Sequence, residues 1–258
     1  MRLLARQVGQ LAARSVRRTF RQPALLAPSL LFPLFLLAVN AGGLDAATRV
    51  PGFPDTSYLS FALAITFVQG ALLATTAAGT NVAEDVRTGF LTRLSLTPLR
   101  GVALLAGELA GATLLALLQS GTAIAVGLAA GATVRSGAPG VVAVVALTVL
   151  ITNAFAAVGV FWALRVGSGE AVQALFPLLF VAFFLSSMFL PRELITTTWF
   201  RAAATLNPLS YMIEGLRSLI VSGWDAQALG LALACTGVLL AAALGGAGRA
   251  LRTRMAQR

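Results

Sequence analysis

The chain has 258 residues, of which 58% are hydrophobic and only 11% are charged, and its net charge is +10. A soluble domain usually carries about 25% charged residues, so this composition excludes an ordinary soluble fold and predicts a single helical membrane domain over residues 1–258. With no histidine, no lysine and one cysteine, Cys235, the sequence excludes a zinc site, a Ser-His-Asp triad and the lysine-containing phosphate loop of ATPases. We expect no catalytic residue, metal ligand or cofactor on this chain.

Residues 1–22 are predicted to form an amphipathic helix that lies in the membrane interface. At about 100° per residue, one face collects most of the apolar side chains and the opposite face collects arginines. The arginines of interest are Arg14, Arg17, Arg18 and Arg21. This pattern is typical of a helix whose arginines face anionic headgroups. The alternative is a twin-arginine export signal, but the apolar run that follows is longer than a usual signal core.

Six apolar blocks are long enough to span a bilayer. They are Ala24–Gly43, Tyr58–Val82, Val102–Ala132, Pro139–Leu164, Ala171–Leu190 and Ala226–Gly248. With both termini in the cytoplasm, the outer segments hold only Arg49, Arg135, Arg192, Arg201 and Arg217 of the 19 arginines. The positive-inside rule therefore predicts a multi-pass protein of a bacterial cell (inner or plasma) membrane with both termini cytoplasmic. Its arginines are expected to contact membrane lipids and not nucleic acid.

The cytoplasmic loop over residues 82–100 opens with charges of both signs and continues with leucines between polar residues. This pattern predicts a short amphipathic helix that ends near Pro98. Two hypotheses fit: an interfacial loop that satisfies the positive-inside rule, or a docking surface for a cytoplasmic partner. The candidate docking residues are Glu84, Asp85, Arg87, Gly89, Leu91, Arg93, Leu94, Leu96 and Pro98.

The outer segment over residues 191–225 is too polar to span and too apolar for a free loop. Its aromatic residues suit the membrane–water interface, and Asn207-Pro208 is a helix break. We expect an external re-entrant or interface-lying helical hairpin; the alternative is an aromatic anchor with no role in transport. The candidate residues are Pro191, Trp199, Asn207, Pro208, Tyr211 and Arg217.

Glu108 is a lone acid about two turns inside the third block, and an intramembrane acid is a functional candidate by default. The alternative is an acid near the cytoplasmic interface that pairs with Arg100 or Arg165. Around it, Gly107 and Gly111 form a GxxxG pattern, which makes this face a candidate dimer contact.

Two local motifs resemble those of the membrane permease subunit of ABC-2 type ABC transporters, and the resemblance covers essentially the whole chain. In that family the loop after the second span resembles E-x-x-x-G-T-L-E-x-L-x-x-T-P. The matching residues here are Glu84 or Asp85, Gly89, Leu91, Leu94, Thr97 and Pro98, while Thr92 stands where a second Glu is common. The second motif resembles L-S-G-x-F-x-P followed by N-P-x-x-Y and an arginine. It is matched by Leu185, Ser186, Phe189, Pro191, Asn207, Pro208, Tyr211 and Arg217, with Ser187 in place of the usual Gly.

The resemblance implies a permease that works with a separate ABC ATPase subunit, which would bind ATP and Mg. The loop helix would be the coupling helix, and a second permease subunit would complete a homodimer or a paralogous heterodimer. Export of a lipophilic drug or lipid, as in multidrug efflux and antibiotic resistance, is the leading expectation. A polysaccharide or glycolipid exporter is the alternative, although the spans are poor in Trp and Tyr. A non-transport integral membrane protein is the other alternative.

Overall fold

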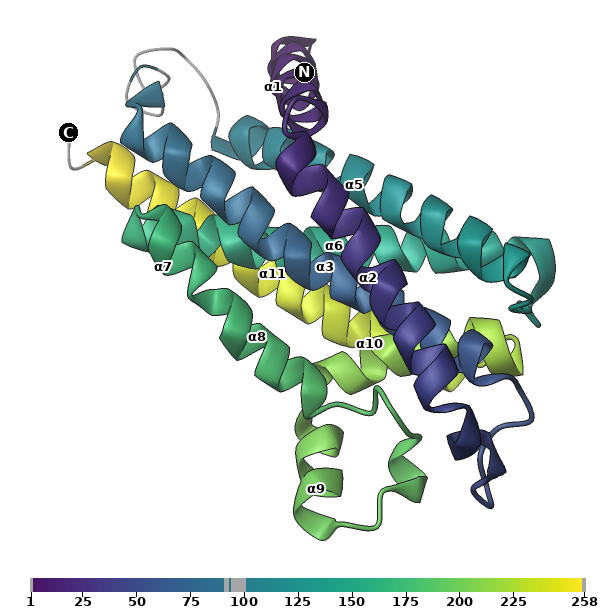
Figure 1. Cartoon of the computed structure of the whole chain (residues 1–258). Helices are drawn as coiled ribbons and strands as arrows, with labels where there is room; N and C mark the ends of the chain where they lie inside the picture. Colours follow the sequence, from purple (N-terminus) through teal and green to yellow (C-terminus); the bar gives the residue numbers. More distant parts are fainter. Residues whose placement is uncertain (1, 91–92, 94–100, 257–258) are drawn as a thin grey trace.

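A computed structural model describes residues 2–90, 93 and 101–256 (Figure 1). Within these ranges the chain is helical and no strand occurs. The elements in chain order are α1 (Arg2–Phe20), α2 (Pro23–Gly43), η1 (Asp45–Arg49), α3 (Tyr58–Arg87), α5 (Gly101–Ala129), α6 (Gly137–Val166), α7 (Gly169–Gln173), α8 (Leu175–Phe184), η2 (Arg192–Leu194), α9 (Thr198–Leu206), α10 (Pro208–Arg217), the π-helical turn η3 (Ser218–Ser222) and α11 (Ala226–Ala256).

The described helices confirm the expected all-α membrane fold. Five of them are long and apolar enough to cross a membrane: α2, α3, α5, α6 and α11. Each coincides with one of the apolar blocks predicted to span. Residues 2–20 form the predicted amphipathic helix, and a helical hairpin, α9 and α10, breaks at Asn207 as expected.

The fifth predicted span, Ala171–Leu190, differs from the expectation of one continuous helix. The chain forms α7, breaks at Ala174, forms α8 and leaves helical geometry after Phe184. The 10 residues of α8 rise about 15 Å, which is half of a hydrocarbon core of about 30 Å. Hydropathy indicated one apolar block, because a break in a helix between apolar residues does not change the mean hydropathy of the segment. The count of six spans stays a prediction.

Segments predicted to be cytoplasmic gather at one end of the bundle, and segments predicted to be external gather at the other. The N- and C-termini both lie at the end opposite α9 (Figure 1). At their end, Arg254 of α11 donates to the carbonyl oxygen of Leu164 on α6. At the far end, the Tyr58 hydroxyl donates to the carbonyl oxygen of Phe189 at 3.2 Å. The chain therefore passes along the bundle an even number of times.

Helix α3 is the centre of the bundle, with 83% of its span buried inside the chain. It packs most extensively on α6, where the two backbones approach closely at Gly159. A Cβ at this position would overlap the carbonyl oxygen of Thr75. Small residues permit such close contact between membrane helices. This packing holds the middle of α3 directly against α6.

The GxxxG pattern on α5 lies against α1, which corrects its interpretation as a dimer contact. A Cβ at Gly107 would meet Leu11, and a Cβ at Gly111 would meet Ser15. The two glycines therefore form a seat for α1 within the same chain. In Figure 1, α1 is seen nearly along its axis at the end of the bundle, so it runs crosswise to α2.

Candidate functional site

The last turns of α3 are joined to α1 by a buried carboxylate. Arg14 donates from both NH groups to Asp85, at 2.8 and 2.6 Å. Arg18 donates to the same carboxylate at 3.2 Å and to the carbonyl oxygen of Asn81 at 3.2 Å. Asp85 is only 3% exposed, and bidentate pairs of this kind are strong and geometrically specific. The hydrogen bond to Asp85 raises the pKa of Arg14. Arg14 therefore stays charged and holds α1 against α3.

These contacts correct two predictions from the sequence. Arg14 and Arg18 were expected to face lipid headgroups, and Asp85 was expected to lie on a docking surface. Instead the three side chains bind one another, because a carboxylate buried at the end of an apolar helix needs cationic partners. Arg17 and Arg21 are exposed, so their contact with headgroups stays a prediction.

The remaining described docking candidates are accessible and lie directly beyond Asp85. Arg87 and Glu84 form an exposed pair at 2.8 Å. Gly89 has a φ of 70°, a left-handed conformation that favours glycine and turns the chain away from α3. Arg93 is exposed. The other candidates, Leu91, Leu94, Leu96 and Pro98, lie outside the described residues.

Glu108 sits behind the Arg14–Asp85 pair, on the face of α5 that meets α1. It is 6% exposed, and its nearest cation among the described residues is Arg14, with 3.9 Å between Nη1 and Oε1. The cation beside Glu108 is therefore Arg14 and not Arg165, which is exposed; Arg100 lies outside the described residues, so pairing with it stays a prediction. Arg14 reaches Glu108 because the two glycines beside it bring α1 against α5. Since both NH groups of Arg14 already bind Asp85, Glu108 receives only this longer contact.

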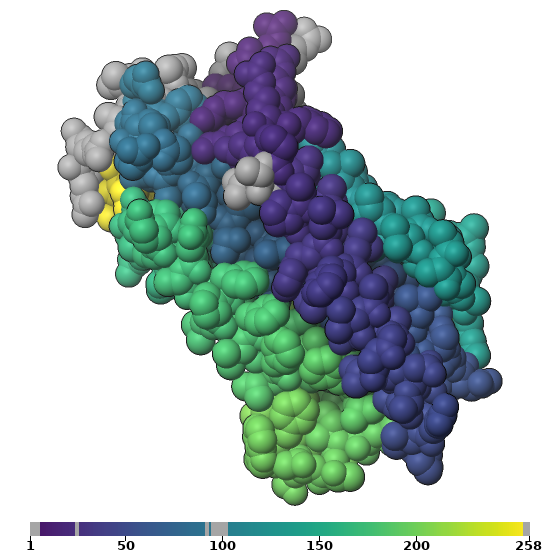
Figure 2. Space-filling model, in the orientation of Figure 1, coloured from purple at the N-terminus to yellow at the C-terminus, as the bar shows by residue number. Residues whose placement is uncertain are grey.

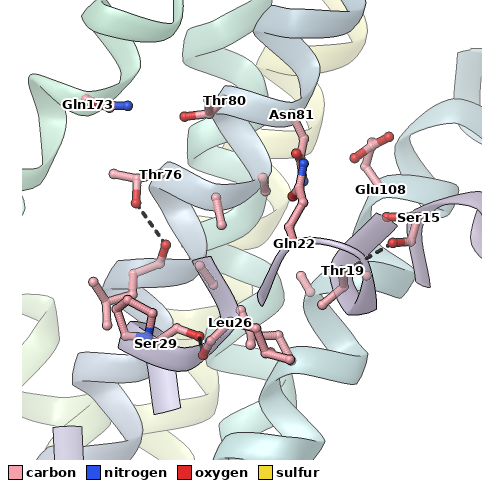
Figure 3. Close-up of a pocket in the computed structure, with 18 of the residues that line it drawn as sticks. Ser15, Thr19, Gln22, Leu26, Ser29, Thr76, Thr80, Asn81, Glu108 and Gln173 are labelled. Carbon is pink, nitrogen blue, oxygen red and sulfur yellow. Dashed lines mark hydrogen bonds between the residues drawn. The ribbon is translucent and has the colours of Figure 1, made fainter. Parts of the chain in front are cut away.

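A cavity of about 380 Å³ opens between α1, α2, α3, α5 and the α7–α8 segment, with Glu108 in its wall (Figure 3). In Figure 2, blue atoms of α3 are visible between the purple of the N-terminal helices and the green of α7 and α8. Neutral polar side chains line one part of it: Ser15, Thr19, Gln22, Thr76, Thr80, Asn81 and Gln173. Apolar side chains line the rest, among them Leu26, Leu73, Leu115 and Phe176. The volume and mixed lining suit one drug-sized ligand.

The cavity and the buried pair were not predicted from the sequence. A partial signal existed on α3, where Thr76 and Thr80 lie one helical turn apart in a mostly apolar run, and Asn81 follows. A polar stripe on a spanning helix indicates a face turned away from lipid. The stripe alone does not say whether it meets another helix or an open space.

The hairpin provides hydrogen-bond partners for the non-helical backbone that follows α8. Arg217 on α10 donates to the carbonyl oxygens of Ser187 and Met188, at 3.0 and 2.8 Å. Its guanidinium also lies 3.6 Å from the ring centroid of Phe61. Asn207 accepts from the backbone NH of Leu209 at 3.0 Å, capping α10. Non-helical backbone at membrane depth needs such partners within the protein.

The aromatic candidates of the hairpin have separate roles. Tyr211 donates to the carbonyl oxygen of Thr205 at 2.8 Å, and its ring lies 4.4 Å from the Arg192 guanidinium. Trp199 is 66% exposed on α9, which suits an interfacial anchor. Pro208 opens α10, where a missing backbone NH costs nothing, and Pro191 precedes η2. The hairpin therefore combines internal bonding with an exposed aromatic edge.

Comparison with known proteins places these features in one family. Residues 6–221 match the model of the family described as ABC-2 type transporter. The matched range includes most of α1, the α3–α5 region and the whole hairpin. None of the curated proteins compared matches the chain.

Proposed function

Because the chain belongs to the ABC-2 type transporter family, we propose that it is the membrane-spanning subunit of an ATP-driven exporter in a bacterial inner membrane. A separate ABC ATPase would bind ATP and Mg, and a second permease subunit, identical or paralogous, would complete the pathway. The chain itself is a transport permease of an ABC transporter and not a catalytic domain. Its substrate would be a lipophilic drug or lipid moved outward.

The main observation that supports this proposal is the hydrogen-bonded contact between Asp85 on α3 and Arg14 on α1. The segment proposed to dock the ATPase begins within a few residues of Asp85, at the exposed Glu84 and Arg87. A force on that segment is therefore applied to the end of α3, and the bidentate contact with Arg14 passes it to α1. Movement of the ATPase would displace two elements at once.

This coupling requires two arrangements of the membrane helices that differ in how tightly the ATPase pair binds ATP. Closure of the ATPase pair would press on the docking segments and shift the bundle between the two states. Rigid-body rotation and helix shifts are the usual forms of such a change. The close packing of α3 on α6 at Gly159 supports movement of these helices as one body.

Co-purification with the ATPase encoded beside the gene tests the proposal. A tag on the permease is expected to bring the ATPase down, and Gly89→Val should weaken the association, since valine disfavours the φ of 70° at this turn. Gly237→Val is the matched control, because Gly237 lies in open space on α11. The proposal fails if no ATPase co-purifies and lipophilic compounds accumulate equally with and without the pair.

A further inference from the structure

We propose that the cavity between α1, α2, α3, α5 and α7–α8 binds a lipophilic organic cation, with Glu108 as its counterion. The inference rests on the proposed function and names the charge of the substrate. The cavity holds about 380 Å³, which is the size of one aromatic or amphipathic molecule. Glu108 is the one acidic or basic side chain among the described residues that line it.

The charge balance around Glu108 leaves its carboxylate open to a ligand. Asp85 holds Arg14 through two hydrogen bonds and Arg18 through a third. Glu108 is 6% exposed, and Arg14 reaches it only at 3.9 Å. No hydrogen bond to its carboxylate occurs among the described side chains. A buried carboxylate without close partners is costly, so a cation placed in the cavity would be strongly favoured.

The rest of the wall suits the body of such a ligand. Leu26, Leu73 and Phe176 supply apolar surface, and the oxygens of Asn81 and Gln173 can accept hydrogen bonds from an ammonium group. Figure 3 shows Glu108 near the α1 side of the cavity, with Gln173 on the opposite side. A molecule with one charged end and a larger apolar end therefore has a defined orientation. An anion in the cavity would be repelled by the Glu108 carboxylate.

Binding of two ions of the same shape and opposite charge tests the inference. The full chain in neutral detergent micelles is titrated with tetraphenylphosphonium and with tetraphenylborate. We expect the cation to bind at least about tenfold more tightly than the anion, and Glu108→Gln to remove this preference by weakening cation binding about tenfold. Glu193→Gln, an exposed acid at the other end of the bundle, is the matched control and should change neither affinity.

A second variant tests the place of binding. Ala77→Trp would fill the cavity from α3, and we expect it to reduce binding of both ions. Equal binding of the two ions to the unmodified chain, or unchanged cation binding in Glu108→Gln, overturns the inference. If Glu108→Gln does not fold, the comparison of the two ions on the unmodified chain still decides. Unchanged binding of both ions in a folded Ala77→Trp also overturns it.

The cation could belong to a soluble compound or to the amine headgroup of a lipid. Added phosphatidylethanolamine should displace tetraphenylphosphonium if a lipid headgroup is the natural occupant, and should leave it bound if a soluble cation is. These binding measurements need no ATPase. A chain that binds the cation but brings down no ATPase would contradict the proposed function alone, and the reverse result would contradict this inference alone.

Discussion

Arg14 and Asp85 lie 71 residues apart in the sequence, yet both NH groups of Arg14 donate to the Asp85 carboxylate, at 2.6 and 2.8 Å. The pair joins the amphipathic helix α1 to the end of the central helix α3. Arg18 shares the carboxylate. Since α1 also rests on the glycines of α5, it is held by both α3 and α5. A shift of α1 relative to α3 would have to break these contacts.

Removal of one partner of this pair should destabilise the chain. Arg14→Gln leaves Asp85 buried with Arg18 alone, and we expect a loss of about 2 kcal/mol, since the arginine is partly exposed and solvent screens the pair. Thermal unfolding of the purified chain in micelles measures the change. Arg17→Gln, on the exposed side of α1, is the matched control.

The double variant Arg14→Gln/Asp85→Asn measures the interaction free energy between the two residues. It should be less destabilised than the sum of the two single variants, because Asp85 then no longer carries a buried charge that has lost Arg14. Strict additivity of the two single changes would mean that the residues do not interact.

The sequence was sufficient for the parts of the fold that depend on local periodicity. The five long apolar helices, the amphipathic α1 and the break at Asn207 all follow from apolar blocks, an arginine face and a proline. The Arg14–Asp85 pair could not be predicted this way, because hydropathy says where helices are but not which faces meet. The break after Phe184 could not be predicted for another reason. The carbonyl groups of Ser187 and Met188, which follow the break, are hydrogen-bonded by Arg217, and Arg217 lies 30 residues beyond Ser187.

The candidate site was only partly predictable. Glu108 was identified from its position inside an apolar block, which needs no structure. Its surroundings depend on the Gly107–Gly111 seat that brings α1 close, and the same glycines were open to interpretation as a dimer contact. A short-range pattern such as GxxxG indicates close packing without naming the partner helix.

Even a conservative substitution of Arg217 by another basic residue should destabilise the hairpin. Lysine has a single ammonium and cannot bond both the Ser187 and Met188 carbonyl oxygens while stacking on Phe61 as the guanidinium does. We expect Arg217→Lys to cost about 1 to 2 kcal/mol and Arg217→Met to cost about 3 kcal/mol, since both carbonyls then lose their partner. Thermal unfolding gives the order of the two variants. Arg249→Met, an exposed position on α11, should stay close to the unmodified chain, and an equal effect at both positions would contradict the role of Arg217.

The crossing of α3 and α6 should be sensitive to a single methyl group. Gly159→Ala places a Cβ against the backbone carbonyl of Thr75, and backbone cannot move aside as a flexible side chain can. We expect a destabilisation of about 1 to 3 kcal/mol, typical of overpacking. Gly237→Ala is the control, because a Cβ there meets nothing within 4 Å. Similar melting temperatures for Gly159→Ala and the unmodified chain would mean that the two helices separate easily.

The position of α9 and the C-terminal end of α11 at opposite ends of the bundle (Figure 1) predicts a simple labelling pattern. In a Cys235→Ser background, which removes the one native cysteine, single cysteines replace Trp199 on α9 and Arg252 on α11. Both positions are exposed. A membrane-impermeant maleimide should label Trp199→Cys in intact cells and Arg252→Cys only after the membrane is opened, since the positive-inside rule places the arginine-rich ends in the cytoplasm. Labelling of Arg252→Cys but not Trp199→Cys in intact cells would invert the orientation, and labelling of both from outside would contradict a membrane crossing by α11.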